Sequence, residues 1–120
     1  MIGRDPVPDA AFNVRVHRLD DAVLLSVVGE VDMLTAPTLA DHIDQVDAGV
    51  AVVVLDLSLV AFFSSTAIAA LIDGQRRLAE KGIGLRVVPS TVVRRALEIV
   101  GLGDTVPMYD EATHALAAAN

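Results

Sequence analysis

The fold of this chain is decided by residues 52–66, Val52-Val53-Val54-Leu55-Asp56-Leu57-Ser58-Leu59-Val60-Ala61-Phe62-Phe63-Ser64-Ser65-Thr66. The β-branched and aliphatic run at its start predicts a buried strand over 50–57, and its two apolar faces favour a central place in a parallel sheet. We expect a short turn at 59–63 and then a helix that opens on three hydroxyls. A helix start carries unpaired N–H groups and the positive end of the helix dipole, which favours a phosphate. One of these hydroxyls is enough to cap the helix. Capping therefore does not explain all three, and both capping and a functional role remain open for them.

Periodicity and turn residues predict the other elements. Before this stretch we expect a hairpin of strands 12–17 and 22–29 with a turn at Leu19-Asp20-Asp21, and a helix that Thr35 caps and that runs to about Val46. After the helix expected at 65–81 we expect a strand over 85–88, a helix capped by Ser90 or Thr91, a possible strand at 106–108 and a last helix capped by Asp110.

This order of elements predicts an α/β fold. We expect a mixed β-sheet of four or five strands covered by about four helices, with more of the helices on one face. The proline-containing residues 1–10 are expected to form a flexible lead-in, and residues 11–120 a single domain.

The composition argues against several classes of function. Only 3% of the 120 residues are aromatic and the formal net charge is −7, so we expect no direct nucleic-acid partner. The chain has no cysteine, which excludes disulfides and thiolate metal sites. No apolar stretch approaches about 18 residues and no signal-peptide pattern is present, so we expect a cytoplasmic protein without membrane insertion. No Gly-rich nucleotide loop or paired histidine motif appears, and no cofactor or metal is expected.

The residues that could carry catalysis are scattered. His17, His42 and His114 fall at expected surface positions of three different elements, so no base is placed beside a serine. Asp32 and Asp56 both fall near predicted strand ends, where two carboxylates can serve as a general acid and base, but turns and caps explain them more simply. We therefore do not expect an enzyme.

Two motifs carry a resemblance to a known family. Residues 29–37, Gly29-Glu30-Val31-Asp32-Met33-Leu34-Thr35-Ala36-Pro37, are similar to a Gly-Glu-hydrophobic-Asp-x-x-Thr/Ser-Ala signature, and residues 55–67 are similar to an Asp-Leu-Ser-x-Val-x-Phe-hydrophobic-Asp-Ser-Ser/Thr-Gly signature. Both signatures belong to the STAS domain of the anti-sigma factor antagonist family. Residues 94–102 also look like the third helix of that family, and the resemblance runs from about residue 12 to residue 118.

The resemblance implies a regulatory binding module. Members of this family bind an anti-sigma factor of the serine-protein kinase type and so free a sigma factor. The partner kinase phosphorylates a serine whose counterpart here is Ser65, with Thr66 or Ser64 as alternatives. The chain departs from the family at Ser64, where the family has aspartate, and at Ala67 and Ala69, where it has glycines.

The partner-binding surface is expected beyond the ends of neighbouring strands. Asp32, which matches the aspartate of the first motif, lies there with the starts of two helices. The expected contacts are Asp32, Thr35, Ser64, Ser65 and Thr66, with Ile68 as an apolar neighbour. Two other readings remain open: a constitutive STAS subunit of a larger assembly, such as a lipid-transport ATPase or a stressosome-like scaffold, without phosphorylation; and an enzyme of unknown type.

Overall fold

A four-stranded sheet forms the centre of the computed structural model, which describes residues 11–118. Its strands are β1 (Asn13–Leu19), β2 (Ala22–Val31), β3 (Val52–Phe63) and β4 (Gly84–Pro89), in the order β1-β2-β3-β4. β1 runs antiparallel to β2, whereas β2, β3 and β4 run parallel to one another. The predicted mixed sheet is therefore confirmed, with β3 as an inner parallel strand. The lead-in expected at residues 1–10 lies outside the described residues.

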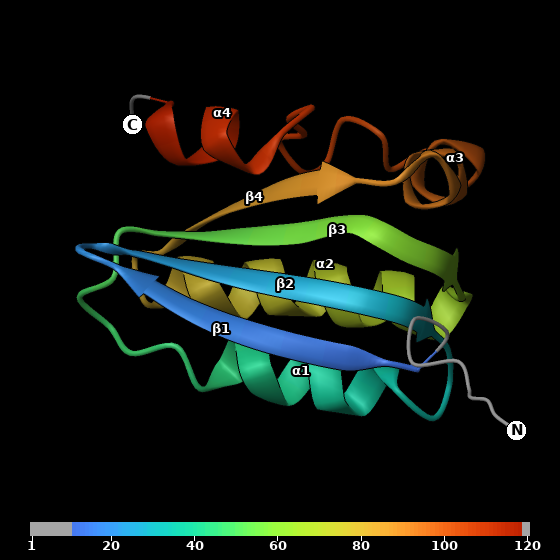
Figure 1. Ribbon diagram of the computed structural model, residues 1–120, viewed down its shortest axis with the longest axis horizontal. Helices are drawn as coiled ribbons and strands as arrows, with labels where there is room; N and C mark the ends of the chain where they lie inside the picture. The colour runs from blue at the N-terminus through green and yellow to red at the C-terminus, as the bar shows by residue number, and fades with distance from the viewer. Residues whose placement is uncertain (1–10, 119–120) are drawn as a thin grey trace, which may run out of the picture.

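Four helices flank this sheet in the described part of the chain (Figure 1). They are α1 (Ala36–Asp44), α2 (Ser65–Glu80), α3 (Thr91–Ile99) and α4 (Ala112–Ala117). α1 and α2 pack side by side and cover one face of the sheet, whereas α4 packs on the other face against β3 and β4. The helices therefore cover one face more heavily than the other, as expected.

Alternation along β2 and β3 builds a core on each face. Odd-numbered side chains over 23–27 and 53–57, such as Leu25 and Leu55, belong to the main core with α1 and α2. On the opposite face Val54 packs with Ala115 of α4. Because both faces of β3 are covered over this stretch, its sequence is apolar without alternation.

Arg86 ties α4 to the second face. The residue is only 8% exposed, and its Nη1 atom donates hydrogen bonds to the carbonyl oxygens of Ala115 (2.7 Å) and Ala118 (3.1 Å). Its guanidinium carbon lies 5.9 Å from the centre of the Tyr109 ring, within the range of a cation–π contact. Carbonyl groups at the end of a helix lack helical partners and favour a cation, so this buried charge is well placed.

β3 extends further than the sequence predicted. The turn expected at 59–63 is the last part of the strand, which stays paired with β2 until Phe63 meets Val31. The pairing contains register shifts, one of them next to Gly29, whose φ of +100° is one that glycine adopts readily. The apolar residues 59–63 continue the strand because β2 is long enough to bond their backbone.

Two smaller predictions were wrong, and that of the hairpin was right. α1 ends at Asp44, close to the predicted end at about Val46. Residues 106–108 form a single bridge to Val87 instead of a strand, because the chain bonds β4 only through the Pro107 carbonyl and the Tyr109 N–H and then turns toward α4. The N-cap residue of α4 is Glu111, not Asp110, and it makes no side-chain cap bond. In the hairpin, Leu19 pairs with Ala22 across the predicted turn.

Candidate partner-binding surface

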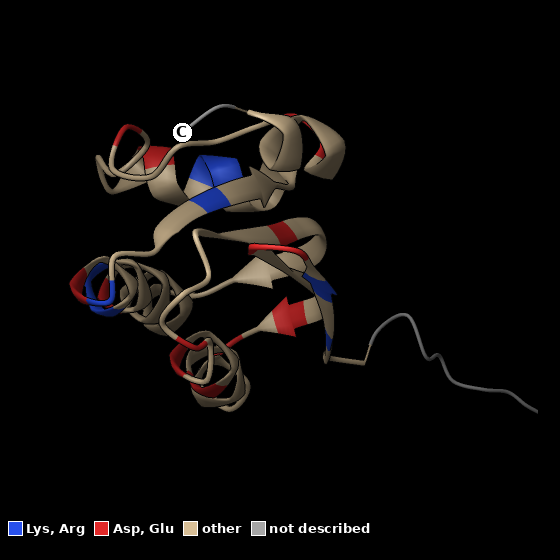
Figure 2. Ribbon diagram, turned by 90° about the vertical axis from the view of Figure 1, so that its left-hand side faces the viewer, with Lys and Arg blue, Asp and Glu red and all other residues tan. Residues whose placement is uncertain are grey.

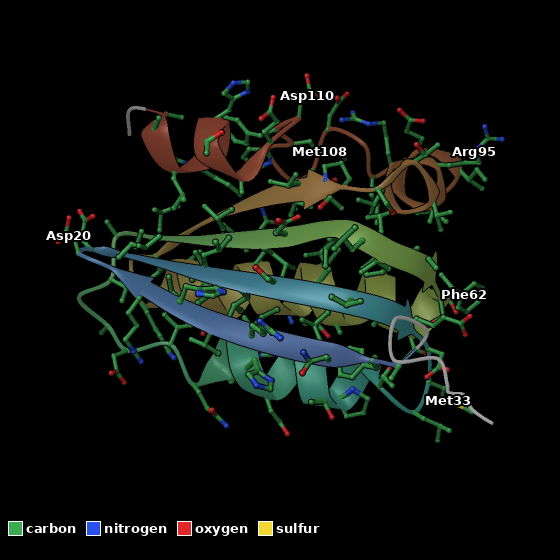
Figure 3. All side chains as sticks on the ribbon, viewed as in Figure 1. Asp20, Met33, Phe62, Arg95, Met108 and Asp110 are labelled. Carbon is green, nitrogen blue, oxygen red and sulfur yellow. The ribbon has the colours of Figure 1, made fainter. Side chains whose placement is uncertain are left out.

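Two loops leave the sheet together at the C-terminal ends of β2 and β3. Val31 and Phe63 are paired as the last residues of these strands, and the Ser64 N–H donates to the Val31 carbonyl at 3.0 Å. Asp32 and Ser64 therefore follow neighbouring strand ends that a backbone hydrogen bond joins. Figure 3 shows the labelled residues Met33 and Phe62 at this end of the molecule, with Asp20 at the opposite end.

Asp32 and Thr35 hold the first loop through reciprocal hydrogen bonds. Asp32 Oδ1 accepts the backbone N–H groups of Leu34 (2.9 Å) and Thr35 (3.0 Å), and Thr35 Oγ1 accepts the N–H of Asp32 (2.9 Å). The single hydroxyl proton of Thr35 can go to the Glu30 carbonyl at 2.9 Å or to Asp32 Oδ1 at 3.1 Å. This arrangement matches the reciprocal logic of a capping box.

The electrostatics of the loop follow from these bonds. The backbone N–H of Thr35 is the main group that lowers the pKa of Asp32, with the Leu34 N–H and the Thr35 hydroxyl assisting and burial opposing. The Asp32 carbonyl also accepts the Ala36 N–H at 2.8 Å, so the chain already turns as a helix before α1. Thr35 is the N-cap residue of α1, as predicted, but its side chain makes no cap hydrogen bond, because its hydroxyl is used inside the loop.

Ser64 is the cap of α2. It has extended backbone geometry (φ −77°, ψ 172°), and its Oγ accepts the N–H of Ala67 at 3.1 Å. Ser65 and Thr66 are exposed, and within residues 11–118 neither side chain makes a hydrogen bond. One hydroxyl of the three is therefore used for capping, and two remain available at a helix N-terminus.

Apolar side chains lie beside these hydroxyls. Ile68 is half-buried in α2 and lines a shallow apolar groove of about 320 Å³, whose other lining residues are Ser65, Ala69, Ile72, Asp73, Val100 and Leu102. In the first loop Met33 is 71% exposed and Leu34 is 83% exposed, and Phe62 at the end of β3 is 48% exposed. The sequence analysis did not predict these three residues as part of the site. The only signal for Met33 and Leu34 is that they form an apolar pair between two polar loop residues, and Phe62 lies within an apolar run that gives no such signal.

The other candidate residues are not brought together. Asp56 lies within β3, opposite Ser26, and its Oδ1 accepts the Ser58 N–H at 3.0 Å. It is thus several residues along the sheet from Asp32, and the prediction that Asp56 lies near a strand end was wrong.

The histidines and charges show no further site within residues 11–118. His17 and His114 are exposed on β1 and α4, while the ring of His42 on α1 lies 2.9 Å from the Thr38 carbonyl. In the described part of the chain no three His, Cys, Asp or Glu residues are placed to hold a metal ion, and no helix is long and apolar enough to span a bilayer. Figure 2 shows Lys and Arg positions distributed over several elements.

A comparison with protein families agrees with this fold. The model of the STAS domain family matches residues 13–115. The chain therefore belongs to the STAS domain family.

Three proteins are similar to this chain over most of both lengths. An anti-sigma factor antagonist from Mycobacterium paratuberculosis is 34% identical, with a TM-score of 0.76 over 92% of this chain and 94% of that one. The anti-sigma-F factor antagonist RsfB of Mycobacterium tuberculosis is 29% identical over 110 residues, which cover 91% of this chain and 89% of the relative. The Bacillus protein SpoIIAA, solved in its phosphorylated form, shares the fold at a TM-score of 0.62, with 19% identity over 88% of this chain and 96% of the other.

Proposed function

We infer that this chain is an anti-sigma factor antagonist that binds an anti-sigma factor of the serine-protein kinase type and so releases a sigma factor. The observation that carries this conclusion is the 34% identity to an anti-sigma factor antagonist over nearly the whole of both chains. The joined ends of β2 and β3 supply a surface on which Asp32, Thr35, Ser64, Ser65, Thr66 and Ile68 lie at or near one edge of the sheet.

Ser65 is the proposed phosphorylation site, with Thr66 or Ser64 as alternatives. Its exposure and its place just after the cap of α2 support this choice, whereas the Ser64 hydroxyl is already engaged with Ala67. A phosphate brings about −1.5 to −2 charges, which the N–H groups and dipole of a helix start accept, so the fold should survive. A strongly hydrated charge placed in a contact surface should weaken partner binding by about a hundredfold or more.

The constitutive alternative has one observation in its favour. Ser64 stands where the family has aspartate, and it caps α2 without supplying a carboxylate beside Ser65. In that reading the same surface binds a partner in a larger assembly and is never modified. In both readings the chain binds a protein, performs no catalysis, and contacts no nucleic acid directly. A regulator of a sigma factor acts where RNA polymerase is, so the proposal places the chain in the cytoplasm.

Incubation with ATP and the anti-sigma factor kinases of the source organism tests the switch. Intact mass should show one added phosphate on the wild type and none on Ser65→Ala. The Ser65→Ala protein should bind the kinase and stay bound, while Ser65→Asp should keep the melting temperature of the wild type and bind poorly. Equal labelling of wild type and Ser65→Ala, or no labelling of either, would falsify Ser65 as the acceptor.

A further inference from the structure

The loop after β2 displays two apolar side chains to solvent. Met33 and Leu34 are 71% and 83% exposed, and they are consecutive residues between Asp32 and Thr35. Such residues are normally withdrawn from water when the chain can achieve it. Here the two side chains form the tip of a loop, which we call the Met33–Leu34 tip.

Hydrogen bonds hold the backbone beneath the tip. Asp32 Oδ1 accepts the N–H of Leu34 at 2.9 Å and that of Thr35 at 3.0 Å, and the Thr35 hydroxyl accepts the N–H of Asp32 at 2.9 Å. The Asp32 carbonyl accepts the N–H of Ala36, which continues the loop into α1. The tip is thus fixed at both ends, so little conformational freedom remains to be lost when it enters a binding pocket.

The tip is continuous with the surface around Ser65. The Ser64 N–H donates to the carbonyl of Val31, the residue before Asp32, at 3.0 Å. Phe62, 48% exposed, pairs with Glu30 at the same end of the sheet. Figure 3 shows Met33 and Phe62 at this same end of the molecule. The hydroxyls of the second loop are therefore accompanied by apolar side chains that belong to a different element.

We propose that the Met33–Leu34 tip is the apolar anchor of this chain, and that it inserts into an apolar pocket on the anti-sigma factor. This inference rests on the proposed function, because it names the partner of that surface. Exposed Met and Leu on a fixed loop are suited to fill such a pocket, and a few buried anchors usually supply most of the affinity of an interface. Asp32 and Thr35 then act as positioning residues rather than as contacts.

The first test removes the anchor. The double variant Met33→Ser/Leu34→Ser should bind the anti-sigma factor at least about thirtyfold more weakly than the wild type in calorimetry or surface plasmon resonance. Its melting temperature should stay near that of the wild type, because both side chains are largely in water. Leu19→Ser is the matched control: this apolar residue is 44% exposed beside Asp20, at the opposite end of the molecule, and the substitution should leave binding unchanged.

The second test separates positioning from contact. Asp32→Ala should weaken binding in the wild-type background, but it should add almost nothing in the Met33→Ser/Leu34→Ser background, because it acts through the tip. Additive losses in this cycle would show that Asp32 contacts the partner directly and would overturn its positioning role.

The outcomes distinguish this inference from the proposed function. The binding probe is a panel of the purified anti-sigma factors of the source organism. Suppose that one of these anti-sigma factors binds the wild type and the Met33→Ser/Leu34→Ser variant equally well, but fails to bind Ser65→Asp. That result would overturn the anchor and leave the proposed function standing. If none binds the wild type, the function is overturned and the anchor with it.

Discussion

At the scale of single residues, Asp32 and Thr35 form the most closely connected pair at the surface. Each side chain accepts the backbone N–H of the other residue, and the Thr35 hydroxyl also reaches the Glu30 carbonyl. These bonds satisfy backbone N–H and carbonyl groups of the loop that would otherwise need hydrogen-bond partners in a bound protein. Both residues are predicted partner contacts, and their hydrogen bonds also shape the loop that follows β2.

Stability should depend on pH through Asp32. Its pKa is lowered from 3.8 in the folded chain, mainly by the Thr35 N–H, so the charged form favours folding. This contribution is present above the unfolded pKa and is lost as pH falls through the folded pKa. We expect wild type to be more stable than Asp32→Asn near neutral pH, and we expect this difference to shrink in strong acid. Urea denaturation of the two proteins at neutral pH and in strong acid measures this difference. A stability difference that stayed the same at both pH values would contradict the role of the Asp32 charge.

At the scale of elements, the start of α2 combines two tasks in neighbouring residues. Ser64 satisfies the Ala67 N–H through its side chain and the Val31 carbonyl through its backbone, while Ser65 and Thr66 remain exposed. Serine and aspartate are both good N-cap residues. The departure from the family at Ser64 therefore preserves the helix start, although it removes a carboxylate.

The stability of α2 should depend on this cap. Ser64→Ala removes the acceptor for the Ala67 N–H, and we expect the free energy of unfolding to fall by about 1 kcal/mol. Ser64→Asp restores an acceptor at the same place and should unfold close to the wild-type denaturant midpoint. Ser65→Ala is the control, since the Ser65 hydroxyl makes no hydrogen bond within residues 11–118. If Ser65→Ala lowered the free energy of unfolding as much as Ser64→Ala, the assignment of the cap to Ser64 would be contradicted.

The elements also show how far sequence reasoning reaches. Strands and helices with a strong period, such as β2 and α2, were predicted almost residue for residue. The last part of β3 was not, because an apolar stretch such as 59–63 becomes a strand only if a neighbour is long enough to pair with it. The exposure of Met33 and Leu34 was not predicted either. The hydrogen bonds of this loop are local, but whether an apolar side chain is buried depends on which other elements reach this end of the sheet.

At the scale of the whole molecule, the two faces of the sheet are unequally protected. α1 and α2 cover the face that carries the main core, whereas α4 covers β3 and β4 on the other face. The uncovered part of that second face is a shallow hollow over β1 and β2, lined by residues that include Asn13, Arg15, His17 and Ser26. The core on the second face is therefore closed by α4, a helix of 6 residues that is too short to be stable alone.

Arg86 should control the docking of α4. Arg86→Ala removes a buried charge that bonds the Ala115 and Ala118 carbonyls, and we expect a loss of about 2 kcal/mol in the free energy of unfolding. Amide hydrogen exchange in α4 should accelerate before that in α2. Arg76→Ala is the matched control, because Arg76 makes an exposed ion pair with Asp73, of a kind worth at most about 1 kcal/mol. Equal losses in the two variants would contradict the special role of Arg86.

The backbone hydrogen bond between Ser64 and Val31 has a consequence for how such proteins diverge. It joins the two loops through main-chain atoms alone, so it places no demand on the side chains at positions 33 and 34. After a gene duplication these two positions can change while the scaffold and Ser65 stay where they are. Under the proposed anchoring by the Met33–Leu34 tip, copies of one ancestral antagonist would acquire separate partners by changing two side chains, and their signalling circuits would become insulated from each other without any change in the fold.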